Sequence, residues 1–265
     1  MHDIIKDMIK KEGELKMVGE GIFPEAILKL RDSITKMFSV IEDISKNPIL
    51  EIDPSEFEPA QYEILKNIDE EIKRQELNYW CIDEDVLNHF YDVQEINDSN
   101  LTDYVQEHLD EIIHSLLEEP LFQLHESLIK ETEEAFKNKY YKLCLFPLFT
   151  LFEQVIVSWY YNQLESGAPQ KTKTKDRNFK NKITVDENIE EDILIIFARS
   201  IVRMYKKTFD KFGNEPSKGL QRNAMFHGYY FYDEIGKRHI LQLFQLLKAS
   251  TVLKFVDKKF VLKSN

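Results

Sequence analysis

Residues 140–164 read YYKLCLFPLFTLFEQVIVSWYYNQL, and this stretch decides the fold class. Apolar side chains fill nearly every position, and a helix that is apolar all round is typical of the buried core of a bundle. Glycine and proline number only 8 each in 265 residues, whereas all-β folds need many turn residues. We therefore expect an all-α protein with residues 140–164 as a central core helix.

The same stretch does not predict a membrane span. Its apolar run, residues 143–161, is broken by Pro147, Glu153 and Gln154, whereas a span needs about 20 residues with few or no charges. The amino-terminal sequence MHDIIKDMIKKEGE lacks the apolar core of a signal peptide. The two cysteines are too few for a disulfide framework. We expect a cytoplasmic protein without a membrane partner.

Apolar residues at intervals of three and four continue on both sides of the core helix. They predict two amino-terminal helices, near residues 4–15 and 27–41. Three prolines in residues 47–61 interrupt this pattern, because proline stops a helix. The later helices are expected over residues 121–136, about 186–208, a short segment within 219–228 that Gly228 ends, and about 233–256.

Charge is divided unevenly along the chain. Residues 1–136 carry 12 Lys+Arg against 34 Asp+Glu, and residues 137–265 carry 23 against 13. Such an asymmetry indicates different partners for the two halves or an interface between them, and the basic half is the better candidate for a polyanion. We predict an acidic helical region in residues 1–120 and a helical bundle in residues 121–265. Residues 51–126 carry 22 acids against three bases, and they form either a solvated helical face, a nucleic-acid mimic or a surface that docks a partner.

The motif that could carry chemistry is RNAMFHG, residues 222–228. Arg222 precedes His227 by five positions, Asn223 follows the arginine, and a glycine follows the histidine. On a helix Asn223 and His227 share a face, whereas Arg222 lies about 140° from His227. One chain therefore presents an incomplete site. Either the long arginine side chain or a second copy across a symmetric dimer would complete it.

The Arg-x4-His spacing resembles the motif of the HEPN superfamily, whose members are helical-bundle ribonucleases and nucleotide-binding modules of prokaryotic toxin and abortive-infection systems. Glu153 resembles the acidic residue that many such domains carry on an apolar helix. The resemblance covers about residues 121–258. It implies a HEPN-like bundle with metal-independent endoribonuclease activity, no cofactor, cyclic-phosphate product ends and a composite site in a homodimer. It also implies a role in antiphage defence or toxin-like growth arrest.

The chemistry of RNA cleavage suits these residue types. Attack by the 2′-hydroxyl needs a group that accepts and donates protons near neutral pH, and histidine has an unperturbed pKa of about 6.5. The arginine guanidinium can donate two parallel hydrogen bonds to two oxygens of one phosphate. We assign His227 as the general acid/base and Arg222 to the scissile phosphate, with Asn223 and Glu153 as further site residues. In the structural alternative His227 bonds a neighbouring helix and Arg222 pairs with Glu153, whose carboxylate needs a partner among apolar neighbours.

Further RNA contacts are predicted outside this motif. Tyr229 extends the match to Arg-x4-His-x-Tyr, which resembles a HEPN toxin group whose tyrosine is modified by a partner nucleotidyltransferase. Tyr229 either stacks on bases or belongs to the core. Residues 171–182 carry six bases and one acid, so they form either a contact with the RNA backbone or a solvated loop. The predicted RNA-binding residues are Tyr229, Lys171, Lys173, Lys175 and Arg177.

A second functional class stays open at this point, a non-catalytic helical module that binds a nucleotide or a protein. Arg222 and His227 would then hold the nucleotide or serve packing, and the acidic region would dock a protein. The expected partners are RNA, a second copy of the chain, and an antitoxin or regulatory protein. No metal site is predicted, because the sequence has no HExxH or CxxC motif.

Overall fold

The computed structural model describes part of the chain, and its described residues are helical, with an isolated β-bridge between Val185 and Leu262 and no strand. This confirms the all-α fold class for that part. The predicted amino-terminal helices near residues 4–15 and 27–41 lie outside the described residues. The described residues are 59–90, 96–164, 179–187, 192–210, 213 and 219–263.

Several helices begin at a residue whose side chain accepts a hydrogen bond from the first turn, as helix N-termini require. Asp83 accepts from Val86 N–H at 3.0 Å, and Asp192 accepts from Leu194 N–H at 2.7 Å.

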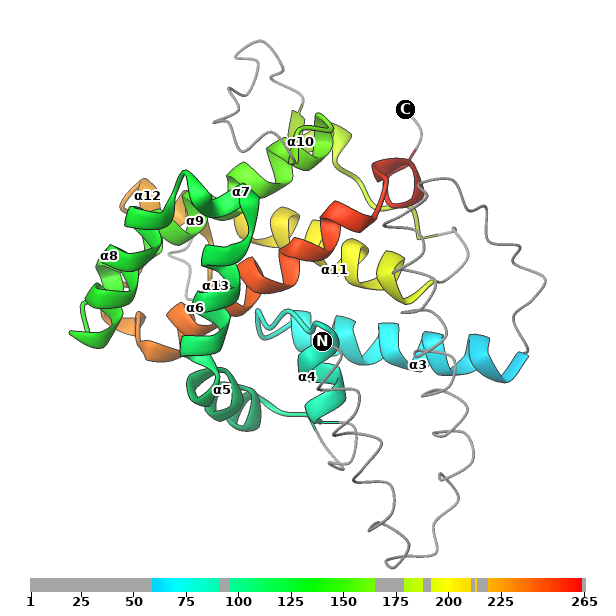
Figure 1. Cartoon of the computed structure of the whole chain (residues 1–265), viewed down its shortest axis with the longest axis horizontal. Helices are drawn as coiled ribbons and strands as arrows, with labels where there is room; N and C mark the ends of the chain where they lie inside the picture. Colours follow the sequence, from blue (N-terminus) through cyan, green and yellow to red (C-terminus); the bar gives the residue numbers. More distant parts are fainter. Residues whose placement is uncertain are drawn as a thin grey trace, which may run out of the picture. The chain divides into compact units, whose positions relative to one another are not determined.

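The helices of Figure 1 are α3 (Pro59–Glu76), α4 (Glu84–His89), α5 (Asp98–Glu107), α6 (Leu109–Glu118), α7 (Pro120–Gln123), α8 (Glu126–Lys137), α9 (Tyr141–Tyr160), α10 (Phe179–Lys182), α11 (Ile193–Phe209), α12 (Arg222–Phe226) and α13 (Lys237–Ser250), with the 3-10 helices η3 (Tyr232–Glu234), η4 (Thr251–Phe255) and η5 (Lys258–Phe260).

The core is built around α9 and α13, which pack against each other (Figure 1). α9 also packs on α8, and α13 also contacts α5, α6 and α11. The side chains of Leu148, Phe149, Leu151 and Phe152 on α9 are fully buried. The prediction of a central core helix in residues 140–164 is therefore confirmed.

α9 also has the length and composition of a membrane span. In the part of the chain that the structure describes it is the one such helix, and 67% of its most apolar 18 residues are buried. The buried core helix of a soluble protein has the same length and composition.

Three helix boundaries differ from the sequence prediction. The helix expected over residues 121–136 is divided into α7 and α8 by a turn at Leu124 and His125. The helix expected from about residue 186 begins at Ile193, because Asp192 caps it. The last helix begins at Lys237 after Gly236, and beyond Ser250 it continues as the 3-10 helix η4.

The chain divides into two compact units, Met1–Ile64 and Leu65–Asn265. This division lies earlier than the boundary predicted at residue 120. The physical reason is that α5 and α6, from the acidic part of the sequence, pack on α13. Leu101 of α5 and Leu116 of α6 are fully buried, so these acidic helices share one core with the carboxyl-terminal half.

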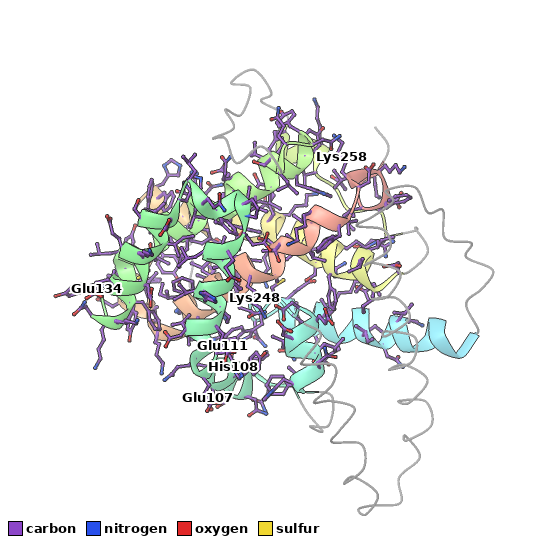
Figure 2. All side chains as sticks on the ribbon, viewed as in Figure 1. Glu107, His108, Glu111, Glu134, Lys248 and Lys258 are labelled. Carbon is purple, nitrogen blue, oxygen red and sulfur yellow. The ribbon has the colours of Figure 1, made fainter. Side chains whose placement is uncertain are left out.

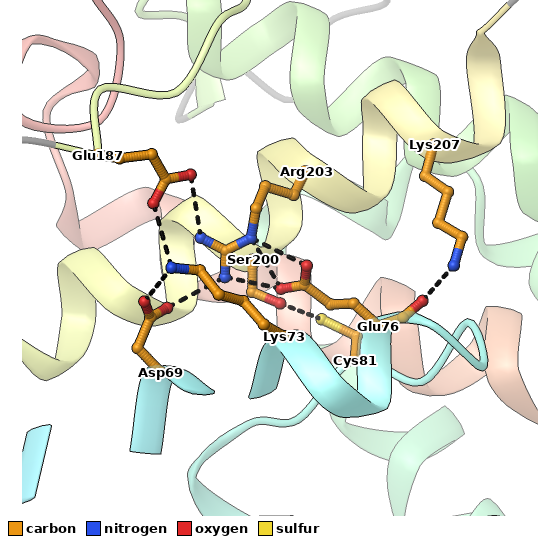
Figure 3. A network of polar contacts seen from close by, with 8 residues as sticks. All are labelled: Asp69, Lys73, Glu76, Cys81, Glu187, Ser200, Arg203 and Lys207. Carbon is orange, nitrogen blue, oxygen red and sulfur yellow. Dashed lines mark hydrogen bonds and ion pairs between the residues drawn. The ribbon is translucent and has the colours of Figure 1, made fainter. Parts of the chain in front are cut away.

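An ion-pair network joins α3 to α11 (Figure 3). Arg203 of α11 donates to both carboxylate oxygens of Glu76, at 2.8 to 3.0 Å, and to Asp69 at 3.2 Å. Lys73 pairs with Asp69 at 2.6 Å, and Glu187 lies 3.4 Å from Lys73 and 3.6 Å from Arg203. Asp69 and Glu76 are only 3% and 7% exposed, so their charges depend on these partners.

Further contacts join the acidic residues to the basic helices. Lys207 donates to the carbonyl of Leu77 at 2.8 Å, and Lys248 (Figure 2) pairs with Asp83 at 3.0 Å and Asp85 at 2.5 Å. Arg238 also pairs with Asp98, Lys254 pairs with Glu119, and Lys137 lies 3.9 Å from Asp110. For the described residues, the charge asymmetry of the sequence therefore corresponds to an interface inside the second unit.

Both cysteines are buried thiols without a disulfide. Burial raises the pKa of Cys144 to about 11, and burial also raises the pKa of Cys81, whose Sγ lies 3.7 Å from the Oγ of Ser200. A thiol with a raised pKa is a poor nucleophile at neutral pH. The two cysteines therefore belong to the core.

Candidate functional site

The candidate site gathers at the short helix α12, which Asn223 holds against the end of α11. The amide nitrogen of Asn223 donates to the carbonyl of Phe209 at 2.7 Å and to the carbonyl of Asp210 at 3.1 Å. The last carbonyls of a helix have no partner within that helix, so Asn223 satisfies two of them. Asn223, predicted as a site residue, acts in this structure by positioning α12.

The guanidinium of Arg222 is held from several directions. Its Nη2 lies 3.5 Å from Oε2 of Glu153, and its Nη1 donates to Oδ1 of Asn223 at 3.2 Å. Its Cζ lies 4.6 Å from the centroid of the Phe226 ring and 5.6 Å from that of Phe209, which are cation–π distances. The side chain is 29% exposed. Arg222 is therefore oriented by its neighbours and still reachable from solvent.

Glu153 reaches this site from the exposed side of α9. The sequence places it among apolar neighbours and predicts that it needs a partner, and Arg222 is that partner. The Glu153 side chain is 35% exposed, so it lies more open than its neighbours Phe149 and Phe152, which are fully buried. The ion pair of the structural interpretation is thus present, and both side chains are partly exposed, so the pair contributes little net stability.

His227 is the C-cap of α12 and is exposed to solvent. Gly228 follows in the left-handed region with φ +74°. The N–H of Tyr229 donates to Ala224 O at 2.8 Å and the N–H of Gly228 to Met225 O at 3.3 Å. This pair of bonds is a Schellman motif, which ends a helix with a glycine. The predicted stop at Gly228 is confirmed, and it sets the backbone position of His227.

We expect Gly228→Ala to lower the free energy of unfolding by about 1 kcal/mol, because a Cβ disfavours the left-handed backbone. No atom lies within 4 Å of the added Cβ, so the whole effect comes from the backbone. The matched control is Gly236→Ala, which has the same free space and an extended φ of −126°. Urea unfolding checks both variants, and equal midpoints for the two would contradict the role given to Gly228.

The structure brings three of the four predicted site residues together in one chain. Arg222 contacts Glu153 and Asn223, and none of the contacts of Arg222 is with His227. This outcome agrees with the angular separation expected on a helix. A single chain therefore presents an oriented guanidinium and an exposed imidazole that are not joined.

The predicted RNA-binding residues fall into two groups. Tyr229 is half-buried, and Tyr230 beside it is buried, which fits the core alternative for this aromatic pair. The hydroxyl of Tyr232 donates to the carbonyl of Met225, which holds the loop after α12 close to that helix. The other predicted residues, Lys171, Lys173, Lys175 and Arg177, lie outside the residues that the structure describes.

Sequence reasoning missed three aromatic residues of the site. Phe226 and Phe209 supply the ring faces against Arg222. The hydroxyl of Tyr205 is buried near the ion pair, and burial together with the charge of Glu153 raises the pKa of Tyr205, although Arg222 acts in the opposite direction. A signal for Phe226 was present, because residues four apart share a helix face. Phe209 and Tyr205 come from another helix, and no local pattern reveals them.

An exposed stripe of α9 leads to the site. Leu143 and Phe146 are 66% and 62% exposed, and the Phe146 ring lies 5.2 Å from the ring of Phe226. Leu143, Phe146 and Glu153 follow the spacing of one helix face. Large apolar side chains that expose this much surface beside a polar site indicate contact with another molecule.

The arrangement can bind an anion and exchange a proton, because it offers an accessible guanidinium and an accessible imidazole. In the described ranges no three His, Cys, Asp or Glu side chains gather as a metal site would require. Comparison with family models, curated proteins and solved structures finds no match to this chain.

Proposed function

We propose that α12 carries half of a metal-independent endoribonuclease site of the HEPN type, which a second copy of the chain completes. The observation that carries the proposal is the state of Arg222. Its guanidinium is oriented by Glu153, Asn223 and Phe226, yet it remains 29% exposed, five residues before an exposed histidine. An oriented and accessible cation is what stabilisation of a pentacovalent phosphate requires.

The proposed reaction needs two proton transfers and one site of positive charge. One His227 accepts the proton of the 2′-hydroxyl, and the 2′-oxygen attacks phosphorus. The bond to the 5′-oxygen breaks, and His227 of the partner subunit donates the proton that this leaving oxygen takes up. Arg222 neutralises the charge on the nonbridging oxygens. The products are a 2′,3′-cyclic phosphate and a 5′-hydroxyl, and atoms and charge balance without a further reactant.

The exposed stripe of α9 is the proposed contact between the two copies. A symmetric dimer buries the same patch of both chains, and Leu143 and Phe146 supply an apolar centre for it. Phe146 contacts Phe226, and Phe226 contacts Arg222. A two-fold axis near Phe146 would therefore bring two copies of α12 close together.

We expect Phe146→Glu to shift the chain from dimer to monomer, because it places two like charges near the proposed two-fold axis. Sedimentation velocity measures the change, and RNA cleavage should fall with the dimer. Leu124→Glu is the matched control, since Leu124 is 53% exposed and lies outside the α9 stripe. A wild-type chain that is monomeric at every concentration used for cleavage would contradict the composite site.

The experiment that tests the function is incubation of purified chain with single-stranded RNA in the presence of EDTA. We expect cleavage that leaves 2′,3′-cyclic phosphate ends, and no cleavage of RNA whose 2′-hydroxyls are methylated. The second candidate is the non-catalytic binding module. The ion pair between Glu153 and Arg222 favours it, because the carboxylate contacts a guanidinium nitrogen that would otherwise bind the phosphate. Binding of RNA without any cleavage would select that candidate.

The proposed cellular role is antiphage defence or toxin-like growth arrest, in which RNA cleavage is held in check by an antitoxin or regulatory protein. Induced expression should then stop growth when Arg222 and His227 are intact. Growth that is arrested equally by a chain lacking both side chains would contradict this role.

A further inference from the structure

The segment after α13 presents exposed aromatic rings beside lysines. Residues 251–263 read TVLKFVDKKFVLK, and Phe255 and Phe260 are 45% and 44% exposed. The Nζ of Lys254 lies 4.9 Å from the ring centroid of Phe255, and the Nζ of Lys259 lies 4.6 Å from that of Phe260. Each ring is thus paired with a cation at the protein surface.

The backbone that carries these rings is fixed to the core. Val261 is fully buried, and Trp159 donates from Nε1 to the carbonyl of Val256 at 2.7 Å. Lys258 (Figure 2) donates to the carbonyl of Tyr160, the last residue of α9, at 2.5 Å, and its Nζ lies 5.0 Å from the Tyr160 ring centroid. A surface held in place in this way loses little conformational entropy when a partner binds.

The same segment carries more basic than acidic residues, although the chain has a net charge of −12. The one acid in residues 251–263 is Asp257, whose carboxylate accepts the backbone N–H of Lys259 at 2.9 Å. Lys254 pairs with Glu119 at 2.5 Å. In the described part of the chain, the lysines of this segment that pair with no carboxylate are Lys258, Lys259 and Lys263. This local surplus of positive charge complements an anion.

We propose that this carboxyl-terminal face binds single-stranded RNA, with bases stacked on the two phenylalanine rings and phosphates on the lysines. Proteins that bind single strands without sequence preference combine these two features, because every base has a flat face and every nucleotide has a phosphate. The ligand is the same as in the proposed function, RNA, but the residues that bind it here are different from those of the α12 site. The carboxyl-terminal face is defined by Phe255, Lys258, Lys259, Phe260 and Lys263.

The position of the face along α9 supports this ligand. Lys258 binds at Tyr160, which follows Glu153 by seven residues. Seven residues make two helical turns, so Tyr160 and Glu153 lie on the same side of α9, about 10 Å apart along its axis. A strand seated on the carboxyl-terminal face can therefore extend along α9 toward Arg222.

An anionic bilayer is the competing ligand, since it also attracts lysines and accepts phenylalanine rings. A flat anionic bilayer would lie against one whole side of the molecule, and it would be repelled by the net charge of −12. A flexible strand instead meets only the charges within a screening length, about 8 Å at physiological salt. The carboxyl-terminal face is positive only locally, which favours the strand.

The test is fluorescence anisotropy of a labelled 2′-O-methyl oligouridine about 12 nucleotides long, titrated with full-length chain. The methyl groups remove the nucleophile, so binding is measured whether or not the chain cleaves RNA. We expect Phe255→Ser with Phe260→Ser to raise Kd at least about tenfold. Lys259→Gln with Lys263→Gln should lower the slope of log Kd against log salt by about 1.4, since each phosphate contact contributes about 0.7.

Matched controls separate this face from the rest of the molecule. Leu124→Ser removes an exposed apolar side chain elsewhere, and Lys130→Gln with Lys137→Gln removes the same charge from α8, where both lysines are about half exposed. Both controls should bind the oligouridine as the wild type does.

Three results would overturn the inference. They are a wild-type chain that does not bind the oligouridine at low salt, phenylalanine variants that bind it unchanged, and binding to phosphatidylserine vesicles in its place. If the wild-type chain binds the oligouridine but does not cleave RNA, the proposed nuclease function is wrong and the RNA-binding face remains supported. If both proposals hold, the phenylalanine variants should lose oligouridine binding. The same variants should still cleave a dinucleotide, which is too short to reach the carboxyl-terminal face.

Discussion

His227→Ala is expected to cleave single-stranded RNA about 10²–10⁴-fold more slowly than the wild-type chain, which is the usual effect of removing a general acid or base. The exposed imidazole sits at the C-cap of α12, at the protein surface and outside the core. The helical circular dichroism signal should therefore be unchanged. The measurement is the rate of appearance of cyclic-phosphate ends in EDTA.

Mixing His227→Ala chains with wild-type chains distinguishes a composite site from a site within one chain. The proposed reaction uses His227 of both copies, so a mixed dimer lacks one of the two proton-transfer groups, and an excess of the His227→Ala chain should suppress cleavage by the wild-type chain. Arg222→Gln removes the phosphate-binding cation and should lower the rate about 10²–10³-fold. Equal rates for His227→Ala and wild type would remove the nuclease proposal altogether.

Arg203→Met is expected to lower the free energy of unfolding by about 3–5 kcal/mol, because it leaves a buried carboxylate without its partner. Glu76 receives three hydrogen bonds from Arg203 and is 7% exposed. Asp69 keeps Lys73 as a partner at 2.6 Å, so most of the loss falls on Glu76. Urea unfolding followed by circular dichroism measures the change.

Two further variants test the cause of this loss. Lys130→Gln breaks an exposed pair with Glu126 on α8 and should cost at most about 0.5 kcal/mol. Replacing Glu76 and Arg203 together by leucine should recover most of the stability lost in Arg203→Met, since apolar residues of similar size often replace a buried ion pair at little cost. An Arg203→Met chain as stable as Lys130→Gln would show that the network carries no stability.

The sequence predicts those features of the fold that depend on local patterns. The apolar run of residues 140–164 predicts a core helix, and α9 is one. Gly228 predicts the end of α12, because the left-handed turn that closes a helix favours glycine, and its φ is +74°. The need of Glu153 for a partner also follows from its apolar neighbours. Each of these features is decided within a few turns of the chain.

Features that depend on contacts between distant residues were not predicted. Arg203 and Glu76 are 127 positions apart, and no periodicity connects them. For the same reason the predicted boundary at residue 120 separates helices that share a core, since α5 and α6 pack on α13. A deletion at residue 120 would remove the fully buried side chains of Trp80 and Leu101 from that core, and it is not a way to isolate the carboxyl-terminal half.

The middle and the carboxyl-terminal end of α11 have different attachments, and the rigid helix couples the two positions mechanically. Arg203 ties one part of α11 to the acidic helix α3, and the carbonyl of Phe209, six residues further on, holds Asn223. Six residues of helix span about 9 Å and do not compress. A shift of the acidic helix that pulls on Arg203 would therefore displace α12 and change the aim of its guanidinium. In the proposed site, a change in the acidic residues of α3 would therefore alter phosphate binding at Arg222.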